Sequence, residues 1–304
     1  MYWFFIALAA PFLWSLVNIS DQYLVAKYST GERESGALVL FSSLIGVFVA
    51  LLIGMFTAGI FQIPMLDKLL LMAIGGITIA WVIIYFSVLA IEDVSAVVPW
   101  FLTVPIFGYV LGYAFLGETL SVQQQIGSLI ILFGVLLISI DFSGKSSVFK
   151  WKPVCYMLLA CFLIAVIGVI FKYVTIENSF WVSSFWEYIG LGIFGILIFI
   201  FSPKYRGEFM LMNKRGGVKI FALNTVSETL TVVGNLLTNF AILLAPVALV
   251  YLVGSFQPVI LLILTLLATR FLPNIIKENM SKQVLVPKII AIGVMVAGSM
   301  VLFL

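Results

Sequence analysis

The chain has 304 residues, of which 63% are hydrophobic and 10% are charged, and its formal net charge is +3. Soluble domains are about half apolar and about a quarter charged, so this composition excludes an ordinary soluble protein. The chain has no histidine, and its two cysteines lie in one apolar segment, which gives neither a metal-ligand cluster nor a disulfide framework. The composition therefore predicts an all-α, multi-pass protein of the cell membrane.

A helix needs about 20 apolar residues to cross a bilayer. Ten segments meet this requirement, at roughly 2–26, 36–57, 67–90, 94–116, 122–140, 153–174, 179–201, 217–244, 246–269 and 286–304. The first has no basic stretch before it and is long enough to span, so we expect an uncleaved helix rather than a signal peptide. The connections between segments are short and leave no room for a soluble domain.

The second half of the chain matches the first weakly but in the same order, at an offset of about 150 residues. Matched pairs are Ala10 with Ala160, Phe12 with Phe162, Leu13 with Leu163, Tyr23 with Tyr173, Pro105 with Pro258 and Gly134 with Gly298. Because each half holds five segments, the second half must enter the membrane with the opposite orientation. We therefore expect two inverted repeats, residues 1–145 and 146–304, an arrangement typical of transporters with a substrate site between the halves.

The first segment carries polar side chains where lipid offers them no water. Trp14, Asn18 and Asp21 stand at positions i, i+4 and i+7, so they share one helix face. A face that is both aromatic and polar is typical of a solute-binding wall. Two alternatives stay open: Asp21 forms a structural ion pair with Lys172 or with a nearby basic residue at the helix end, or Lys172 simply extends to the membrane interface.

Aromatic residues in the third and fourth segments are further candidates for contact with a substrate. Trp81 and Tyr85 share a face of the third segment, and Trp100 lies in the fourth. Rings beside carboxylates attract organic cations or stack on aromatic metabolites. The alternative for each tryptophan is packing between helices or anchoring at the interface.

A series of short motifs in the first half is similar to a known family. The series consists of Ala90-Ile91-Glu92-Asp93-Val94-Ser95-Ala96, then Pro105, then Gly117-Glu118-Thr119-Leu120, Gln125, Gly127 and Gly134. It resembles the EamA domain of the drug/metabolite transporter superfamily. Two such domains with ten helices make up members of this family, so the resemblance covers the whole chain and implies transport of a small molecule.

The second half departs from the EamA pattern at two positions. Arg270 stands where the Gly-Glu motif would fall, and Ala291 replaces the glycine that matches Gly127. An essential role for the Gly-Glu motif is therefore not expected. We interpret Glu118 as a residue that caps the N-terminus of the next helix.

The eighth segment carries a polar stripe along an otherwise apolar helix. Its members recur at helical spacing and are Asn224, Glu228, Thr231, Asn235, and Thr238 or Asn239. A charged residue at the bilayer centre costs about 2.5–3.5 kcal/mol, so such a residue faces a cavity or a partner. We predict a cavity wall, with Asn224, Glu228 and Asn235 in contact with substrate. The alternative is interhelical hydrogen bonding that holds the bundle together.

Glu187 in the seventh segment is the second deeply placed glutamate. Ser183 and Gly190 lie on its face of the helix, and such small residues permit close helix contact. Desolvation favours the neutral form of a carboxyl group, so Glu228 and Glu187 are predicted to bind and release coupled protons. The family resemblance implies a more peripheral place for the seventh helix.

The ninth segment contributes Tyr251 and Gln257 to the predicted substrate site. Pro246 and Pro258 in this segment remove backbone hydrogen bonds, as Pro99 and Pro105 do in the fourth. These prolines are candidates for hinges or for static kinks.

Most lysines and arginines lie in loops that follow odd-numbered segments. The positive-inside rule then makes these loops cytoplasmic and leaves both termini on the opposite side. The family resemblance instead implies cytoplasmic termini, so the orientation stays open.

The chain has no nucleotide-binding loop, so transport is predicted to be secondary and to need no cofactor. We expect an exporter or proton-coupled antiporter that moves a small organic metabolite or organic cation by alternating access. Its expected partners are the substrate, membrane lipids and protons, with no nucleic acid, and its expected state is a monomer or homodimer. A flippase for a lipid or lipid-linked substrate is the alternative. An enzyme is not expected, because no nucleophile motif or metal-ligand set is present.

Overall fold

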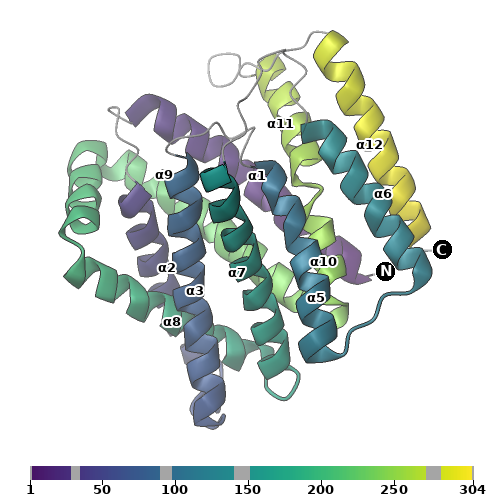
Figure 1. Ribbon diagram of the computed structural model, residues 1–304. Helices are drawn as coiled ribbons and strands as arrows, with labels where there is room; N and C mark the ends of the chain where they lie inside the picture. The colour runs from purple at the N-terminus through teal and green to yellow at the C-terminus, as the bar shows by residue number, and fades with distance from the viewer. Residues whose placement is uncertain (1, 29–34, 90–97, 140–150, 272–281, 303–304) are drawn as a thin grey trace.

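The computed structural model describes residues 2–28, 35–89, 98–139, 151–271 and 282–302, although not every side chain within these ranges. The regular elements in this part of the chain are all helical (Figure 1). They are α1 (Tyr2–Tyr28), α2 (Ser35–Phe56), α3 (Met65–Leu89), the 3₁₀ helix η1 (Val98–Thr103), α5 (Val104–Leu116), α6 (Val122–Ser139), α7 (Trp151–Thr175), α8 (Phe180–Phe201), α9 (Pro203–Leu244), α10 (Val247–Gly254), α11 (Gln257–Phe271) and α12 (Lys282–Leu302).

Seven stretches within the described ranges are long and apolar enough to cross a membrane. They are Tyr2–Ser20, Ala37–Phe56, Met65–Val88, Trp151–Thr175, Phe180–Phe201, Phe221–Leu244 and Val247–Leu264. Three shorter apolar helices are Val104–Leu116, Val122–Gly134 and Ile289–Leu302. These stretches overlap the ten segments predicted from the sequence. The prediction of an all-helical, multi-pass membrane protein is confirmed at this level.

Two predicted segments are interrupted rather than continuous helices. In the fourth, the 3₁₀ turn of η1 leads into α5, which has Pro105 in its first turn. In the ninth, α10 ends at Gly254, and α11 begins at Gln257 immediately before Pro258. Proline lacks an N–H group and its ring clashes with the preceding turn, so each helix restarts at the proline. The sequence left hinges and static kinks open at these prolines, and the structure places Pro105 and Pro258 in the first turn of a new helix; residues 94–97 lie outside the described ranges.

Helix α9 contains the predicted eighth segment and a shorter helix before it. Gly217 separates the two parts with φ 55° and ψ −161°, a left-handed conformation that favours glycine. The spanning part therefore begins just after Gly217, close to the predicted start at residue 217.

Glycines allow α6 and α12 to pack closely against each other. A Cβ atom on Gly127 would lie 2.7 Å from the backbone nitrogen of Leu302, and one on Gly134 would lie 2.6 Å from Cγ of Met295. From α12, a Cβ on Gly298 would lie 2.9 Å from the backbone nitrogen of Ile131. Small residues at such positions let the backbones of membrane helices approach. Gly127 and Gly134 of the EamA-like pattern therefore have a packing role.

A second close contact joins α3 to α8. A Cβ atom on Gly75 would overlap the backbone of Leu191, and one on Gly190 would overlap the backbone of Met72. The expectation that Gly190 permits close helix contact on its face of α8 is confirmed.

The remaining helix contacts define which helices are neighbours. Helix α1 packs on α9, α10 and α11, and α7 packs on α3 and α5. Helix α2 packs on α8 and α9, α3 on α8, and α5 on α10. The bundle therefore mixes helices from the two halves of the chain instead of dividing into two separate bodies (Figure 1).

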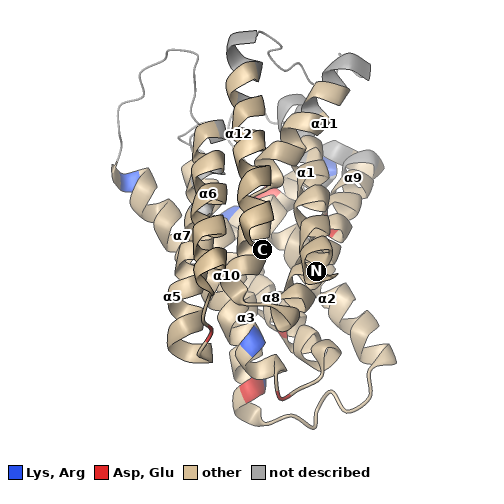
Figure 2. Ribbon diagram, turned by 90° about the vertical axis from the view of Figure 1, so that its right-hand side faces the viewer, with Lys and Arg blue, Asp and Glu red and all other residues tan. Residues whose placement is uncertain are grey.

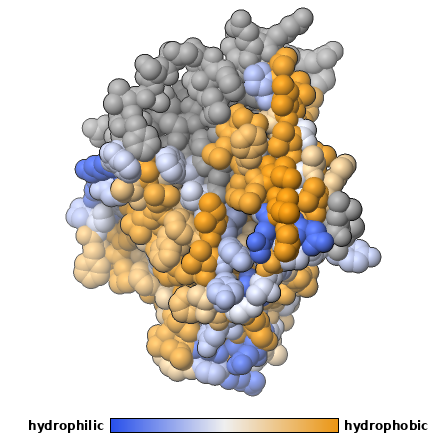
Figure 3. Space-filling model, turned by 45° about the vertical axis from the view of Figure 1, so that its right-hand side comes forward, coloured by the Kyte–Doolittle hydropathy of each residue, from blue (hydrophilic) through white to orange (hydrophobic). Residues whose placement is uncertain are grey.

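The surface of the described part is largely apolar. Figure 3 shows broad hydrophobic areas on the visible face. Large side chains such as Phe48, Phe56, Phe115 and Phe133 are exposed. Charged residues are sparse along the ribbons (Figure 2). Such a surface fits a lipid environment, because water would disfavour so much exposed apolar area.

Candidate functional site

The two deep glutamates each have a partner on another helix. The Ser42 hydroxyl on α2 donates a hydrogen bond to the Glu228 carboxylate on α9 at 2.5 Å. The Asn239 amide on α9 donates to the Glu187 carboxylate on α8 at 2.9 Å. Hydrogen bonds to a carboxylate offset part of the free energy of moving it out of water. Both glutamates therefore stand at the junction of α2, α8 and α9.

Tyr188 is near both of these carboxylates. Its hydroxyl is within electrostatic range of both Glu187 and Glu228, and it donates a long hydrogen bond of 3.5 Å to the backbone carbonyl of Val232. Glu187 is also within electrostatic range of the Tyr251 hydroxyl. One part of the candidate site is therefore made of Glu187, Glu228, Tyr188 and Tyr251. We call this set the carboxylate group, after its two glutamates. Glu187 is part of it, although the family resemblance implied a peripheral seventh helix.

Other members of the polar stripe have different surroundings. Thr231 and Thr238 donate to carbonyls of their own helix, at Ser227 and Gly234. Asn224 is buried, and its amide lies 3.8 Å from the sulfur of Met212. Asn235 is half-buried, one turn before Asn239.

The first helix meets α9 through Trp14. A Cβ atom on Gly234 would lie 2.7 Å from the indole nitrogen of Trp14, so the ring lies directly over this glycine. Asn18 is half-buried one turn further along α1, and the side chain of Asp21 lies outside the described residues. Trp14 is therefore beside α9 at Gly234, the residue before Asn235 in the chain.

Tyr251 and Gln257 have packing contacts with other helices. The Tyr251 hydroxyl donates to the carbonyl of Ile164 on α7 at 2.9 Å, and its ring lies against Gly168 and Gly108. The Gln257 carbonyl accepts a hydrogen bond of 3.3 Å from Ser15 of α1. Tyr251 thus joins α10 to α5 and α7, close to Glu187.

The aromatic candidates of the third and fourth segments come together. The rings of Trp81, Tyr85 and Phe101 lie with their centroids 5.5–6.4 Å apart. Trp100 packs with Tyr85 and Phe101 around Val88 and Met157, and with Tyr251 around Cys161. An aromatic group therefore extends from α3 through η1 to Tyr251, next to the carboxylate group.

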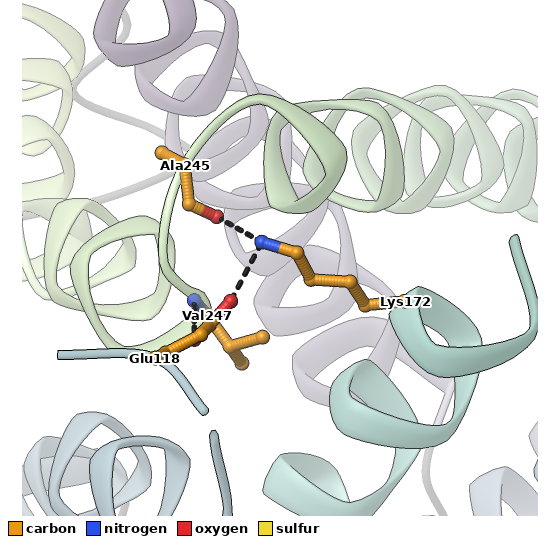
Figure 4. A network of polar contacts seen from close by, with 4 residues as sticks. All are labelled: Glu118, Lys172, Ala245 and Val247. Carbon is orange, nitrogen blue, oxygen red and sulfur yellow. Dashed lines mark hydrogen bonds and ion pairs between the residues drawn. The ribbon is translucent and has the colours of Figure 1, made fainter. Parts of the chain in front are cut away.

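A buried network at the end of α5 was not predicted from the sequence (Figure 4). The Lys172 ammonium forms an ion pair with Glu118 at 2.6 Å and donates to the carbonyl of Ala245 at 2.8 Å. The second Glu118 oxygen accepts from the backbone N–H of Val247 at 2.8 Å. Glu118, which the sequence did not identify as a partner, holds Lys172, and the proposed pairing of Asp21 falls on a side chain outside the described residues. Lys172 does not extend to the interface, since its side chain is 12% exposed.

The Gly117-Glu118 motif has a specific local geometry. Gly117 has φ 65°, a left-handed value that ends α5, and the Glu118 N–H donates to the carbonyl of Gly112. Gly112 has no side chain, so the Glu118 carboxylate can lie over it; a Cβ there would be 2.7 Å from the carboxylate.

The motif therefore directs Glu118 back along α5, towards the first residue of α10. The interpretation of Glu118 as a cap on the next helix in the chain was wrong. Ser121 and Gln124 cap α6 by reciprocal hydrogen bonds, whereas Glu118 caps α10.

The residues that the sequence did not identify are short hydroxyl side chains and the partners of Glu118. Ser42 stands in an apolar segment with no polar residue three or four positions away, and Ser15 was passed over because a single serine in a helix usually bonds only its own backbone. Ala245 and Val247 take part through backbone atoms, which leave no signal in the sequence.

One described cavity is lined by residues other than the predicted site residues, although its Ile53 belongs to the same buried cluster as Tyr188. It measures about 270 Å³ and is lined by Leu52, Ile53, Phe56, Thr57 and Trp181. Leu52 stands ten residues beyond Ser42 on α2, about 15 Å along the helix axis. Its apolar lining and exposed Phe56 and Trp181 place it at the lipid-facing surface.

These features define a helical, multi-pass membrane protein with carboxylate and aromatic groups inside its bundle. The model of the EamA-like transporter family matches residues 1–140. The resemblance drawn from the sequence motifs is confirmed there: this region is EamA-like, and the family is one of membrane transporters. None of the curated proteins matches the chain by sequence.

A solved structure described only as the crystal structure of a protein has a similar fold. The TM-score is 0.69 at 16% sequence identity, and the similarity covers 99% of this chain and 96% of the other. At this identity the similarity shows the fold alone.

Proposed function

We propose that the protein is a secondary transporter that moves a small organic metabolite or organic cation across the cell membrane by alternating access. The observation that carries this proposal is the pair of inward carboxylates, Glu187 and Glu228, beside a group of aromatic rings in an EamA-like bundle. A solute site of this kind combines a low-dielectric lining with a few polar groups that fix orientation.

The proposed architecture is ten spans in two inverted repeats, residues 1–145 and 146–304. Its support is the symmetry of the helix contacts. The repeats pair each helix of the first half with one of the second: α1 with α7, α2 with α8, α3 with α9, η1 and α5 with α10 and α11, and α6 with α12. Under this pairing, the contact of α1 with α9 corresponds to the contact of α7 with α3. Likewise α5 on α7 corresponds to α11 on α1, and α3 on α8 to α9 on α2. The interrupted helices at Pro105 and Pro258 also occupy corresponding places. Inverted repeats with broken helices are a common basis for alternating access.

The chemistry of the candidate site favours a cationic substrate. Glu187 and Glu228 supply acidic oxygens inside the bundle, and the rings of Trp81, Tyr85 and Phe101 lie together on α3 and η1. Aromatic faces attract an organic cation by cation–π interaction, and a carboxyl group in a low-dielectric site also binds a proton.

In this proposal Glu228 couples transport to protons, with Glu187 as a second proton site. Protonation of Glu228 and binding of a cationic substrate exclude each other, because both neutralise the same carboxylate. A proton gradient then drives export of the substrate, which makes the protein an exporter or a proton-coupled antiporter.

Transport by the purified protein in liposomes tests this proposal. The liposomes are loaded in turn with tetraphenylphosphonium, a polyamine and an amino acid, and release is followed after a pH jump of either sign. We expect pH-driven release of an organic cation by the natural protein. Glu228→Gln should lose the pH dependence, whereas Glu177→Gln should keep it, because Glu177 is exposed in the loop after α7.

Wild-type pH dependence in Glu228→Gln would refute its coupling role. Absence of pH-driven release for the whole panel would refute the class of substrate.

A lipid flippase is a second candidate that one observation favours. The cavity at Leu52, Phe56 and Trp181 is apolar and opens at the lipid-facing surface, and the exposed Lys204 and Lys214 precede the spanning part of α9. Transfer of a fluorescent lipid between leaflets by the same liposomes would favour this function over the first.

A further inference from the structure

We infer that the Glu118–Lys172 ion pair is a gate that holds the two halves of the chain together at one end of the bundle and opens once in each transport cycle. This inference rests on the proposed alternating access. The gate consists of Glu118, Lys172 and the two backbone groups that they bind, the Ala245 carbonyl and the Val247 N–H.

The gate joins elements that belong to different halves. Glu118 stands in the turn from α5 to α6, in the first half. Lys172 is in the last turn of α7, and Ala245 and Val247 flank the turn from α9 to α10, all in the second half. The four groups therefore fasten one half to two separate elements of the other (Figure 4).

Each charged side chain of the gate has two partners. Lys172 binds one carboxylate oxygen of Glu118 and a carbonyl, while the other oxygen binds a backbone N–H at the start of α10. Both side chains are only 11–12% exposed. With so little water at the pair, a partly separated arrangement would leave both charges buried without compensation, so the formed arrangement and the one with both charges in water are favoured. That property suits a contact that must be either closed or open.

The gate lies where the two halves of the chain meet, and alternating access must break the contacts at one such place. Helices α5 and α10 pack against each other behind it, and Tyr251 of α10 spans the space between α5 and α7. When one half tilts relative to the other to expose the interior at this end, Glu118 must leave Lys172 and Val247. A merely structural ion pair would instead stay formed in every conformation.

Cysteine accessibility distinguishes these two roles in the full-length protein. Cys155 and Cys161 are first replaced by alanine, and the protein is placed in lipid nanodiscs, where both membrane faces are open to a water-soluble methanethiosulfonate reagent. One reporter is Leu111→Cys on α5, a partly buried residue packed behind the gate. The other is Phe101→Cys in η1, among the aromatic rings at the opposite end of α5.

Opening the gate should change the two reporters in opposite directions. With Glu118→Gln or Lys172→Gln, we expect Leu111→Cys to react about tenfold faster or more, and Phe101→Cys to react more slowly, because the population shifts towards the conformation open at the gate. Glu177→Gln, a change of an exposed acid at the same end, should alter neither rate.

Unchanged rates in both gate variants would overturn the inference, and so would faster reaction at both reporters, which is the signature of a loosened fold. Transport by the natural protein is measured in parallel. If the two reporter cysteines change rate in opposite directions but the natural protein transports nothing, the gate is supported and the proposed function is refuted. If the natural protein transports its substrate but the reporter rates do not change in the gate variants, only the gate is refuted.

Discussion

Replacement of Lys172 by methionine tests the energetic account of the network at Glu118. Methionine keeps most of the side-chain volume but removes the charge, so Glu118 loses its ion pair and the Ala245 carbonyl loses a donor. Removal of one partner from a buried ion pair lowers stability by about 3–5 kcal/mol, since a charge is left buried without compensation. That loss is large beside a net folding stability of about 5–15 kcal/mol.

The double variant Lys172→Met, Glu118→Gln separates the ion pair from general disruption. Glutamine can still accept the hydrogen bond from the Val247 N–H through its carbonyl oxygen, and no unpaired charge remains. We therefore expect the double variant to be more stable than Lys172→Met alone, with a coupling free energy of about 1–3 kcal/mol.

Reversible unfolding in mixed micelles, followed by tryptophan fluorescence as dodecyl sulfate is added, gives the four free energies of this cycle. A loss below about 1 kcal/mol in Lys172→Met, the magnitude of an exposed ion pair, would refute the account of a network that is shielded from water. A strictly additive double variant would refute the direct coupling of the two charges.

Three further predictions concern packing and the candidate site. Gly298→Ala should lower the free energy of unfolding by about 1–3 kcal/mol, because its methyl group would press on α6. Gly293→Ala in the same helix has open space beside it and should be neutral or slightly stabilising. Unfolding in mixed micelles compares the two variants, and equal effects would contradict the close contact between α6 and α12. Asn239→Ala should lower stability by about 1.5–3 kcal/mol, since the Glu187 carboxylate loses its hydrogen bond, and a neutral result would mean that this bond is replaced by another. Trp81→Ala should reduce the thermal stabilisation produced by a bound organic cation by at least half, and an unchanged thermal shift would place the ligand away from the aromatic group.

The fold was largely predictable because hydropathy reports directly on membrane spans. Each apolar run longer than about 20 residues identified a helix, and Gly217 marked where the spanning part of α9 begins. Hydropathy does not distinguish a continuous helix from two helices separated by a turn, so the sequence marked Pro105 and Pro258 as possible hinges or kinks without showing that a new helix begins at each. Proline in such a segment indicates a kink or a break, and packing decides between them.

The candidate site was only partly predictable, because helical spacing gives the face of a residue but not the helix that this face meets. The spacing placed Glu228 and Asn235 on one stripe, yet their partners depend on rotation of α9 against α2 and α8. Glu118 shows the limit most clearly: its partners, Lys172 and the backbone of Val247, lie far along the chain. The motif read as a local helix cap is in fact a contact between the two halves.

The most direct test of the account is the accessibility of Asn235, which stands on α9 between Glu228 and Asn239. With Cys155 and Cys161 replaced by alanine, Asn235→Cys is treated in liposomes of known orientation with an impermeant thiol reagent applied from one side and then from the other. If α9 lines a chamber that opens alternately to the two sides, the cysteine reacts from each side and a bound organic cation slows both reactions. Failure to react from either side, in protein that still binds its ligand, would contradict a transport chamber between the two halves.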